Sequence, residues 1–330
     1  MRGCWLKRSG GRQFAGGASR ALLLFAVLFS LAGCSRHEQV EAFETTDRLY
    51  GLWARDGSHV WAVGEEGSIL HSKDGGEHWR PQNSGTESRL VSIFGSGSEL
   101  WTVGADGTIL HSTDGGEHWK PQKSGTDHHL FSVYAIGPQV WAVGERGTIL
   151  HSANGGKDWQ PQASGTRRQL SSIYAVGSLV WTVGDEGAIL HSADGGQTWQ
   201  AQTSSVTVSL RSIFGNGSQL WAAGDSGFVL TSVDGGEHWG LETSGTEDTL
   251  CALWGTGTQL WTVGTNGIIL SSTDGGRNWQ SEASATAHHL LGIFGNGSQI
   301  WSVGYGGAIM HSEDGGRNWH REISENLPSG

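Results

Sequence analysis

The chain has 330 residues, of which 32 are acidic and 21 are basic, and its formal net charge is −11. This acidic balance excludes nucleic acid as a partner, because proteins that bind nucleic acid present a basic face to the phosphates. A disulfide framework is also excluded, since the chain has three cysteines and two of them, Cys4 and Cys34, lie close to the N-terminus.

The N-terminus has the features of an export signal. Residues 1–33 hold five cations, no acidic residue and an apolar run at 21–31 that is too short to span a bilayer. The run ends in Leu31-Ala32-Gly33-Cys34, which resembles the lipobox of bacterial lipoproteins. This resemblance implies a lipoprotein signal peptide at 1–33 and lipidation of Cys34. The serine that follows the cysteine implies an exported protein anchored to the outer membrane of the cell envelope. The alternative is an ordinary secretory signal with a chance cysteine.

Residues 34–48 are polar and without periodicity, so we expect a lipidated N-terminus and a tether. From residue 49 to residue 330 the sequence repeats with a period of forty residues. One tryptophan series marks the repeat: Trp61, Trp101, Trp141, Trp181, Trp221, Trp261 and Trp301. A second follows at Trp79, Trp119, Trp159, Trp199, Trp239, Trp279 and Trp319. A period near forty residues is typical of units that bury their apolar faces only against their neighbours.

Each unit predicts four short strands. In the second unit, strands are expected at 90–95, at 100–104, at 108–112 and around Trp119, with glycine-rich turns between them. Seven such units predict an all-β, seven-bladed β-propeller of four-stranded antiparallel blades that start near residues 49, 90, 130, 170, 210, 250 and 290. The sequence leaves open how the ring closes, because residues 39–43 also align with the end of a fourth strand.

The turn between the third and fourth strands carries the motif Ser-x-Asp-x-Gly-x-x-Trp, first at Ser72–Trp79. It resembles the Asp-box, or bacterial neuraminidase repeat, of sialidases and other propellers. Its longer form at Gly107–Trp119 is similar to the propeller family of the photosystem II stability and assembly factor. That resemblance implies a chaperone-like role in building a membrane complex. The repeated acidic or amide residue is Asp74, Asp114, Asn154, Asp194, Asp234, Asp274 and Asp314.

We interpret these Asp-box residues as structural, because a short carboxylate in a glycine-rich turn accepts hydrogen bonds from its own backbone. The histidines that also recur once per unit, at 71, 111, 151, 191 and 311, are interpreted as packed side chains, because metal ligands must converge on one ion. No metal site and no cofactor is therefore expected. Cys251, in a predicted strand, is interpreted as a small buried hydrophobic residue.

Function is expected where the repeats differ. In an antiparallel blade, the loop between strands two and three and the link to the next blade share one rim, and loops on a rigid scaffold are the usual seat of binding. The candidate partner-binding residues on this rim are Glu65, Glu66, Arg89, Asp106, His128, His129, Glu145, Arg146, Arg167, Arg168, Asp185, Glu186 and Tyr305. Among them Arg146, Arg167 and Arg168 fall at one blade junction and suit an anionic or acidic protein segment. Neutral drift on a solvated surface is the alternative.

The leading interpretation is a non-catalytic, membrane-anchored propeller that binds a protein partner or scaffolds assembly in the cell envelope. The alternative is a carbohydrate-binding propeller or a glycoside hydrolase of the sialidase type. The sialidase resemblance implies an arginine trio and a tyrosine–glutamate nucleophile pair. Tyr134 and Tyr174 occupy an aromatic position shared by the blades, so no pair is evident, although Glu65, Asp106 or Asp185 could serve a two-carboxylate mechanism.

Overall fold

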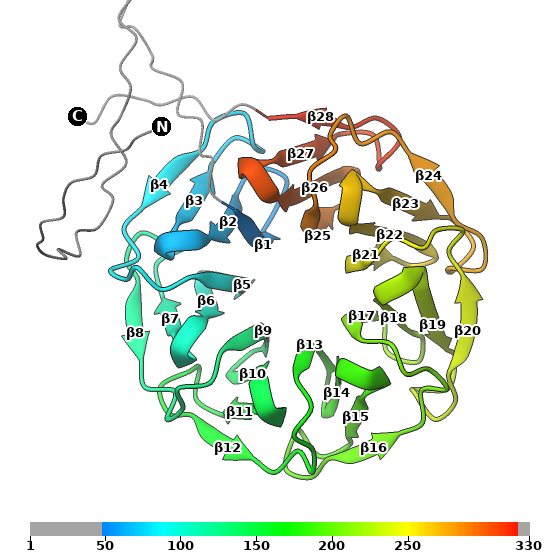
Figure 1. Cartoon of the computed structure of the whole chain (residues 1–330). Helices are drawn as coiled ribbons and strands as arrows, with labels where there is room; N and C mark the ends of the chain where they lie inside the picture. The colour runs from blue at the N-terminus through cyan, green and yellow to red at the C-terminus, as the bar shows by residue number, and fades with distance from the viewer. Residues whose placement is uncertain (1–47, 323–330) are drawn as a thin grey trace, which may run out of the picture. The chain divides into compact units, whose positions relative to one another are not determined.

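The computed structural model describes residues 48–322. The predicted signal peptide, Cys34, the predicted tether up to residue 47 and residues 39–43 lie outside this range. The described chain forms seven four-stranded antiparallel sheets around a central axis, which confirms the predicted seven-bladed propeller (Figure 1). Within the described range, no helix is both long enough and apolar enough to cross a membrane.

The innermost strands surround the axis and start at the leucine that begins each repeat. They are β1 (Leu49–Ala54), β5 (Leu90–Ser96), β9 (Leu130–Ile136), β13 (Leu170–Val176), β17 (Leu210–Gly215), β21 (Leu250–Thr256) and β25 (Leu290–Asn296). The second strands carry the first tryptophan series. They are β2 (Val60–Gly64), β6 (Glu99–Gly104), β10 (Gln139–Gly144), β14 (Leu179–Gly184), β18 (Leu220–Gly224), β22 (Gln259–Gly264) and β26 (Gln299–Gly304).

The third strands are short and almost wholly buried. They are β3 (Ile69–Ser72), β7 (Ile109–Ser112), β11 (Ile149–Ser152), β15 (Ile189–Ser192), β19 (Phe228–Ser232), β23 (Ile269–Ser272) and β27 (Ile309–Ser312). The outer strands are exposed. They are β4 (Arg80–Gln82), β8 (Lys120–Gln122), β12 (Gln160–Gln162), β16 (Gln200–Gln202), β20 (Gly240–Thr243), β24 (Gln280–Glu282) and β28 (His320–Arg321).

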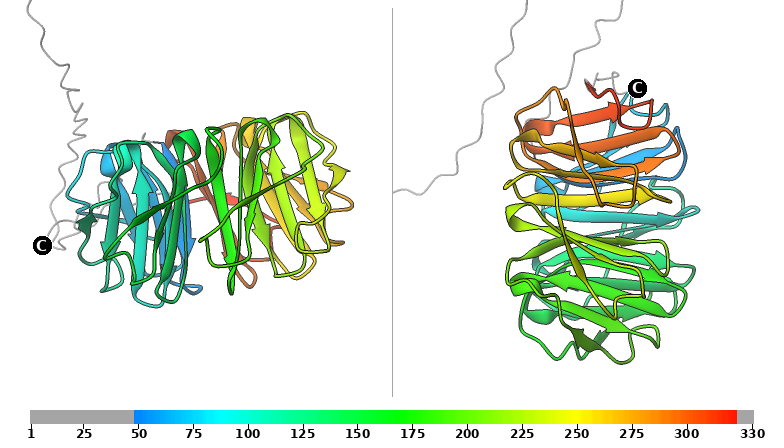
Figure 2. Two further views of the ribbon diagram at one scale, coloured as in Figure 1. Left: turned by 90° about the horizontal axis from the view of Figure 1, so that it is seen from below. Right: turned by 90° about the vertical axis from the view of Figure 1, so that its right-hand side faces the viewer.

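The predicted loops between strands two and three are three-residue turns, labelled η, whose middle residue has a positive φ of 52–66°. They are η1 (Glu65–Gly67), η2 (Ala105–Gly107), η3 (Glu145–Gly147), η4 (Asp185–Gly187), η5 (Asp225–Gly227), η6 (Thr265–Gly267) and η7 (Tyr305–Gly307). Each begins with an N–H donated to the link that precedes its blade, as from Ala105 to the Arg89 carbonyl at 2.9 Å. The η elements and blade links therefore share one face of the propeller, called here the variable rim (Figure 2).

Neighbouring blades are joined through the first tryptophan series. These side chains are at most 3% exposed, and five of them donate the indole N–H to an Asp-box glycine carbonyl of the next blade at 2.8–3.3 Å. One of the five bonds runs from Trp301 to Gly75 and so joins blade seven to blade one. Every sheet consists of four consecutive strands, so the ring closes without strand exchange among the described residues.

The recurring histidines pack within their own blades. Each lies directly across from the tryptophan of the neighbouring strand, as His71 does from Trp61, and the two rings stack with centroids 4.2 Å apart. The other four histidine–tryptophan pairs have centroid distances of 4.9–5.2 Å. This cross-strand stacking places one histidine in each of five blades.

The Asp-box side chains organise their own turns. In every blade the serine Oγ donates to the Asp or Asn Oδ1 at 2.7–2.9 Å and accepts from a glycine N–H at 2.8–2.9 Å. The same Oδ1 accepts a backbone N–H four residues on. These bonds favour the charged carboxylate.

Acid should therefore weaken the fold. Hydrogen bonds from the Thr198 side chain and backbone lower the pKa of Asp194 to about 2, and the equivalent bonds do the same for Asp114, Asp234, Asp274 and Asp314. A carboxyl pKa that is lowered by folding adds stability above the unfolded value near 4, and this stability is lost as the pH falls towards 2. We expect the Tm, measured by circular dichroism at low ionic strength, to fall between pH 5 and pH 2.

Asp194→Asn tests the cause of this acid sensitivity. Asn154 already fills an Asp-box and makes the same bonds, with its Nδ2 donating to Asp158 at 2.8 Å. The amide does not titrate, so Asp194→Asn should flatten the acid limb of the Tm curve, whereas Asp127→Asn, at an exposed link position, should leave it unchanged. An acid limb equally steep in both variants would contradict the Asp-box explanation.

Candidate functional site

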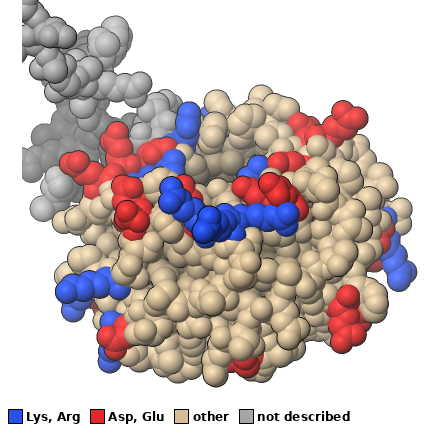
Figure 3. Space-filling view, turned by 60° about the horizontal axis from the view of Figure 1, so that its bottom comes forward, with Lys and Arg blue, Asp and Glu red and all other residues tan. Residues whose placement is uncertain are grey.

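A cavity of about 810 Å³ lies at the centre of the propeller and opens on the variable rim. Its lining includes link residues such as Arg89 and His289, η residues such as Asp225 and Tyr305, and side chains of all seven innermost strands. Figure 3 shows the hollow at the centre of this rim. The cavity is called here the mouth cavity.

A β-bulge in each innermost strand shapes the mouth cavity. In all seven blades the pairing with the second strand skips one residue, as between Leu90 and Ser92, so that Val91 has no partner in the ladder. A bulge bends the strand and re-aims the side chain of the unpaired residue. The seven bulged residues all line the cavity: Tyr50, Val91, Phe131, Ser171, Arg211, Cys251 and Leu291.

The bulged residues differ from blade to blade, although their neighbours are nearly constant. A leucine precedes each of them, and a glycine, serine or alanine follows. Sequence reasoning missed these seven positions, because it placed function in the loops and treated strand one as a repeated core element. The signal was nevertheless present, as one freely varying position inside an otherwise repeated strand.

Below the bulges, the cavity ends on a ring of aromatic side chains. The ring takes one residue from each blade: Trp53, Phe94, Tyr134, Tyr174, Phe214, Trp254 and Phe294. Six of the seven neighbouring pairs have centroids 4.3–6.4 Å apart. Burial raises the pKa of both Tyr134 and Tyr174, so both phenols are neutral. The floor of the cavity is therefore uncharged and aromatic.

Charged groups gather around the opening above. Arg211 donates from Nε and Nη2 to the two carboxylate oxygens of Asp225, each at 2.9 Å, and this hydrogen bonding raises the arginine pKa. The Arg89 guanidinium carbon lies 5.6 Å from the Tyr50 ring centroid, and that of Arg48 lies 4.4 Å from the ring of Tyr305. Arginines stacked on aromatic rings keep their donors available at the rings' edges.

Two hydrogen-bond donors lie at the cavity, and only one of them has a partner. The Tyr50 hydroxyl donates to Glu65, and burial, followed by this bond, raises the tyrosine pKa. Among the described residues, the buried Nε of Arg89 has no hydrogen-bond partner. The Tyr50–Glu65 contact corrects the sequence interpretation that no tyrosine–glutamate pair is evident, because that interpretation considered Tyr134 and Tyr174 but not the bulged Tyr50.

Cys251 is a bulged residue that lines the cavity and is half-buried, so it is not the fully buried residue that we expected. Burial raises the pKa of its thiol to about 11, against the lowering effect of nearby Arg211. A thiol with so high a pKa is protonated at neutral pH and is a weak nucleophile. Cys251 therefore adds a small, weakly polar surface to the cavity wall.

The predicted rim residues divide between the mouth cavity and the outer part of the rim. Arg89 and Tyr305 line the cavity, and Glu65 accepts a hydrogen bond from Tyr50, which also lines it. His129 Nδ1 accepts the Asp106 N–H at 2.9 Å, and His129 Nε2 lies 4.0 Å from Glu145 Oε1, so these three residues form one contact group. His128 bonds Thr148 at 2.7 Å, while Asp185 is half-buried and Glu66 is exposed.

The predicted arginine cluster lies outside the mouth cavity. A Cβ added to Gly147 would come within 2.2 Å of the Thr166 carbonyl oxygen, so Arg146 and Arg167 extend from two backbone segments in direct contact. Both side chains are exposed, whereas Arg168 pairs with Glu186 at 2.9 Å. Figure 3 shows basic side chains in a run along the near edge of the rim, with acidic ones beside them.

Solved structures of other proteins share this propeller fold. The structure of YCF48 bound to a D1 peptide is 22% identical, over 84% of this chain and 96% of that chain, with a TM-score of 0.69. YCF48 from Cyanidioschyzon merolae is 19% identical, over 83% of this chain and 98% of that chain, also with a TM-score of 0.69.

An inactive virginiamycin B lyase from Staphylococcus aureus with quinupristin is 17% identical, over 82% of this chain and 97% of that chain, with a TM-score of 0.70. At these identities the likenesses show the fold alone, which propellers of different function share. No curated protein sequence matches the chain.

The sequence itself gives the family. A family profile described as photosynthesis system II assembly factor YCF48 matches residues 32–131, 87–213, 174–243 and 251–330, which together take in almost all of the propeller. The chain therefore belongs to the family of the photosynthesis system II assembly factor YCF48.

Proposed function

We propose that the chain is a non-catalytic assembly scaffold of the cell envelope that binds a segment of a protein partner at the mouth cavity. The observation that carries this proposal is the set of seven bulged residues. A scaffold repeated seven times presents seven unlike side chains around one opening, and it does so at positions that have no register partner in the second strand. Such a surface can be specific without any change to the fold.

The chemistry of the opening suits a peptide. Arginine and tyrosine are enriched at the energetic centres of protein interfaces, and here Arg89 stacks on Tyr50 beside the apolar Phe131 and Leu291. The Arg89 guanidinium group lines the cavity and offers donors to a peptide carbonyl or carboxylate. The YCF48 structure solved with a D1 peptide supports a peptide ligand for this propeller family.

The outer part of the variable rim extends the proposed contact surface. Arg146 and Arg167 are exposed and leave their guanidinium groups available to an acidic stretch of the same partner. Lipidation at Cys34 would hold the propeller at the membrane, where the partner would also be located. Two or more acyl chains are needed for stable anchoring.

We expect Arg89→Ala and Phe131→Ala each to weaken binding by about tenfold or more, because each removes a central contact. Peptides selected from a random displayed library on the purified chain supply the probe, and fluorescence anisotropy supplies the affinity. Val233→Ala is the control, since Val233 is 72% exposed and lies in an Asp-box on the opposite rim. Selected peptides whose affinity is unchanged in both cavity variants would exclude the mouth cavity as the binding site. A sugar array in place of peptides tests the carbohydrate-binding alternative.

Cys34→Ala tests the proposed anchor. Loss of the lipidated residue should move the protein from the membrane fraction to the soluble fraction of fractionated cells, whereas Cys251→Ala should leave it with the membranes. The distribution is measured by immunoblotting of the two fractions. Wild-type protein already found in the soluble fraction would argue for the ordinary secretory signal and against lipidation.

A second candidate function, glycoside hydrolysis, is favoured by one observation. Tyr50 and Glu65 form a tyrosine–glutamate pair with Arg89 against the tyrosine ring, which is the kind of pair that the sialidase resemblance implies. Against this candidate, the cavity lining contains one carboxylate, Asp225, and both of its oxygens are engaged by Arg211.

Tyr50→Phe distinguishes the two functions. If the pair is catalytic, release of the fluorophore from a fluorogenic sialoside should be measurable in the wild type and should fall at least a hundredfold in Tyr50→Phe, since the nucleophile is lost. If the cavity binds peptide, neither protein cleaves the sialoside, and the peptide affinity of Tyr50→Phe changes only modestly because the ring under Arg89 remains.

A further inference from the structure

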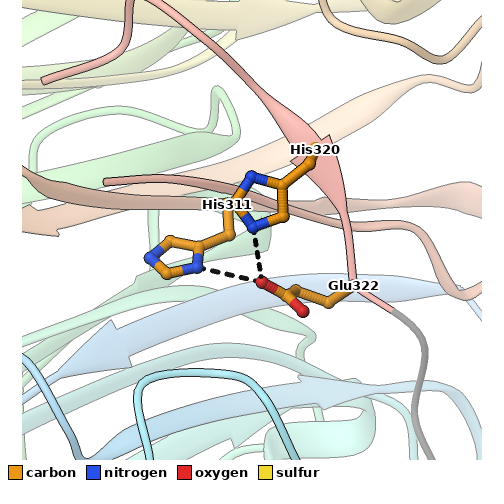
Figure 4. A group of neighbouring side chains, drawn as sticks. All are labelled: His311, His320 and Glu322. Carbon is orange, nitrogen blue, oxygen red and sulfur yellow. Dashed lines mark hydrogen bonds and ion pairs between the residues drawn. The ribbon is translucent and has the colours of Figure 1, made fainter. Parts of the chain in front are cut away.

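We propose that blade seven holds a site for a divalent first-row transition metal such as Zn²⁺, formed by His311, His320 and Glu322. His311 Nδ1 lies 2.9 Å and His320 Nε2 lies 3.0 Å from the same carboxylate oxygen of Glu322. One ligand atom from each of the three residues lies within 4.8 Å of the others. Figure 4 shows the three side chains pointing toward one another from β27 and β28.

The register of the sheet gathers these side chains. His311 and His320 are directly opposed in the β27–β28 pair. Glu322 follows His320 by two residues and so projects from the same face of the sheet. His311 is 5% exposed, and the side chain of Glu322 is 13% exposed, whereas that of His320 is 54% exposed. The site therefore has a buried side and an open side.

Blade seven is unlike the other six at these positions. The residues equivalent to His320 and Glu322 are Arg80 and Gln82, Lys120 and Gln122, Gln160 and Gln162, Gln200 and Gln202, Gly240 and Glu242, and Gln280 and Glu282. Blades one to four keep the histidine of strand three but have glutamine at the position of Glu322, and the acid that contacts His111 is Glu99 of strand two. Blades five and six have the acid, but Thr231 and Ser271 replace the histidine. Within residues 48–322, blade seven alone has a ligand residue at all three positions.

The hydrogen bonding of His311 leaves a ligand atom directed at the carboxylate. Its Nε2 lies 2.6 Å from Gln299 Oε1, an acceptor, so Nε2 carries the proton of this bond and Nδ1 is the ring nitrogen that faces Glu322. A lone pair and a carboxylate oxygen 2.9 Å apart repel each other unless a proton or a metal ion lies between them. The His311 ring stacks on Trp301 with the ring centroids 4.9 Å apart and the ring planes 8° apart, and this stacking fixes the plane of the imidazole.

This arrangement corresponds to a metal site with an outer shell. Metal-bound histidines usually donate their second N–H to an oxygen that fixes the tautomer, and Gln299 does so here. Two histidines and one carboxylate leave a fourth position for water in a tetrahedral zinc site. Zinc ligands at ordinary bond lengths are about 3.3 Å apart, so each histidine nitrogen would move only a few tenths of an ångström from the Glu322 oxygen, and the two histidine nitrogens already lie within 4.8 Å of each other. Imidazole ligands favour zinc, copper or nickel over calcium or magnesium.

Two other groups of histidine and acid, Asp74–Glu77–His78 and Asp234–Glu237–His238, are exposed on the Asp-box rim. Their aspartates already accept a backbone N–H of the turn and the hydroxyl of Ser72 or Ser232, so these carboxylates are engaged in holding the turn. They serve as internal controls. At the blade-seven site, in contrast, a bound metal would join β28, which is two residues long, to β27, whose His311 ring stacks on Trp301.

Zinc and cobalt binding to the purified chain, prepared without a polyhistidine tag, tests the site. Calorimetric titration should show one zinc per chain, and cobalt should give the visible absorption of a tetrahedral ion. His320→Gln and Glu322→Gln should each weaken binding by about a hundredfold or more, and Gln299→Leu by about ten- to a hundredfold. His238→Gln should have no effect. Metal-free Tm values equal to that of the wild type show that each variant is folded.

A gain-of-function variant completes the test. Blade three has the same outer shell, because His151 Nε2 lies 2.7 Å from Gln139 Oε1 and the His151 ring stacks on Trp141. The double variant Gln160→His/Gln162→Glu should therefore raise the stoichiometry from one zinc to two. Absence of zinc binding by the wild type, or binding that persists in His320→Gln and Glu322→Gln, would overturn the proposal and leave these residues as a hydrogen-bonded cluster.

Discussion

The contact between a buried tryptophan and an Asp-box glycine of the next blade is the interaction on which the propeller depends. It brings the apolar face of one sheet against the turn of its neighbour, and in five junctions the indole N–H is satisfied by the glycine carbonyl. In the other two, Trp61 and Trp261, the indole nitrogen lies against Gly116 and Gly316 so closely that a Cβ there would come within 2.6 Å of it. The glycines are thus required by close approach as well as by their positive φ.

This constraint explains why so much of the fold could be predicted from the sequence. A residue that must fit the same contact seven times must recur seven times, so the tryptophans and Asp-boxes are visible as a forty-residue period. The position of a blade boundary follows from the leucine that starts each innermost strand, since Leu90 and its equivalents are fully buried. None of these inferences needed any knowledge of the unlike residues.

The candidate site was less predictable for the same reason. A bulge inserts one residue into a strand, and alternation between inward and outward side chains cannot reveal it where both neighbours are buried or small. Tyr50 and Arg211 therefore read as ordinary members of strand one. Their partners, Glu65 and Asp225, are fourteen to fifteen residues away in sequence and meet them only through the pairing of two strands. The chain is acidic overall, yet three arginines, Arg48, Arg89 and Arg211, lie around the mouth, where Asp225 and Glu65 offset part of their charge.

The bulges also separate recognition from folding, which most protein surfaces combine in the same residues. A bulged residue has no register partner in the second strand, and its side chain takes no part in the tryptophan–glycine contacts that join the blades. Duplicated blades could accordingly diverge at seven positions, one at a time, without passing through unstable intermediates. Recognition and folding are then encoded by different residues of the same strand, and the specificity of the mouth is free to evolve at little thermodynamic cost.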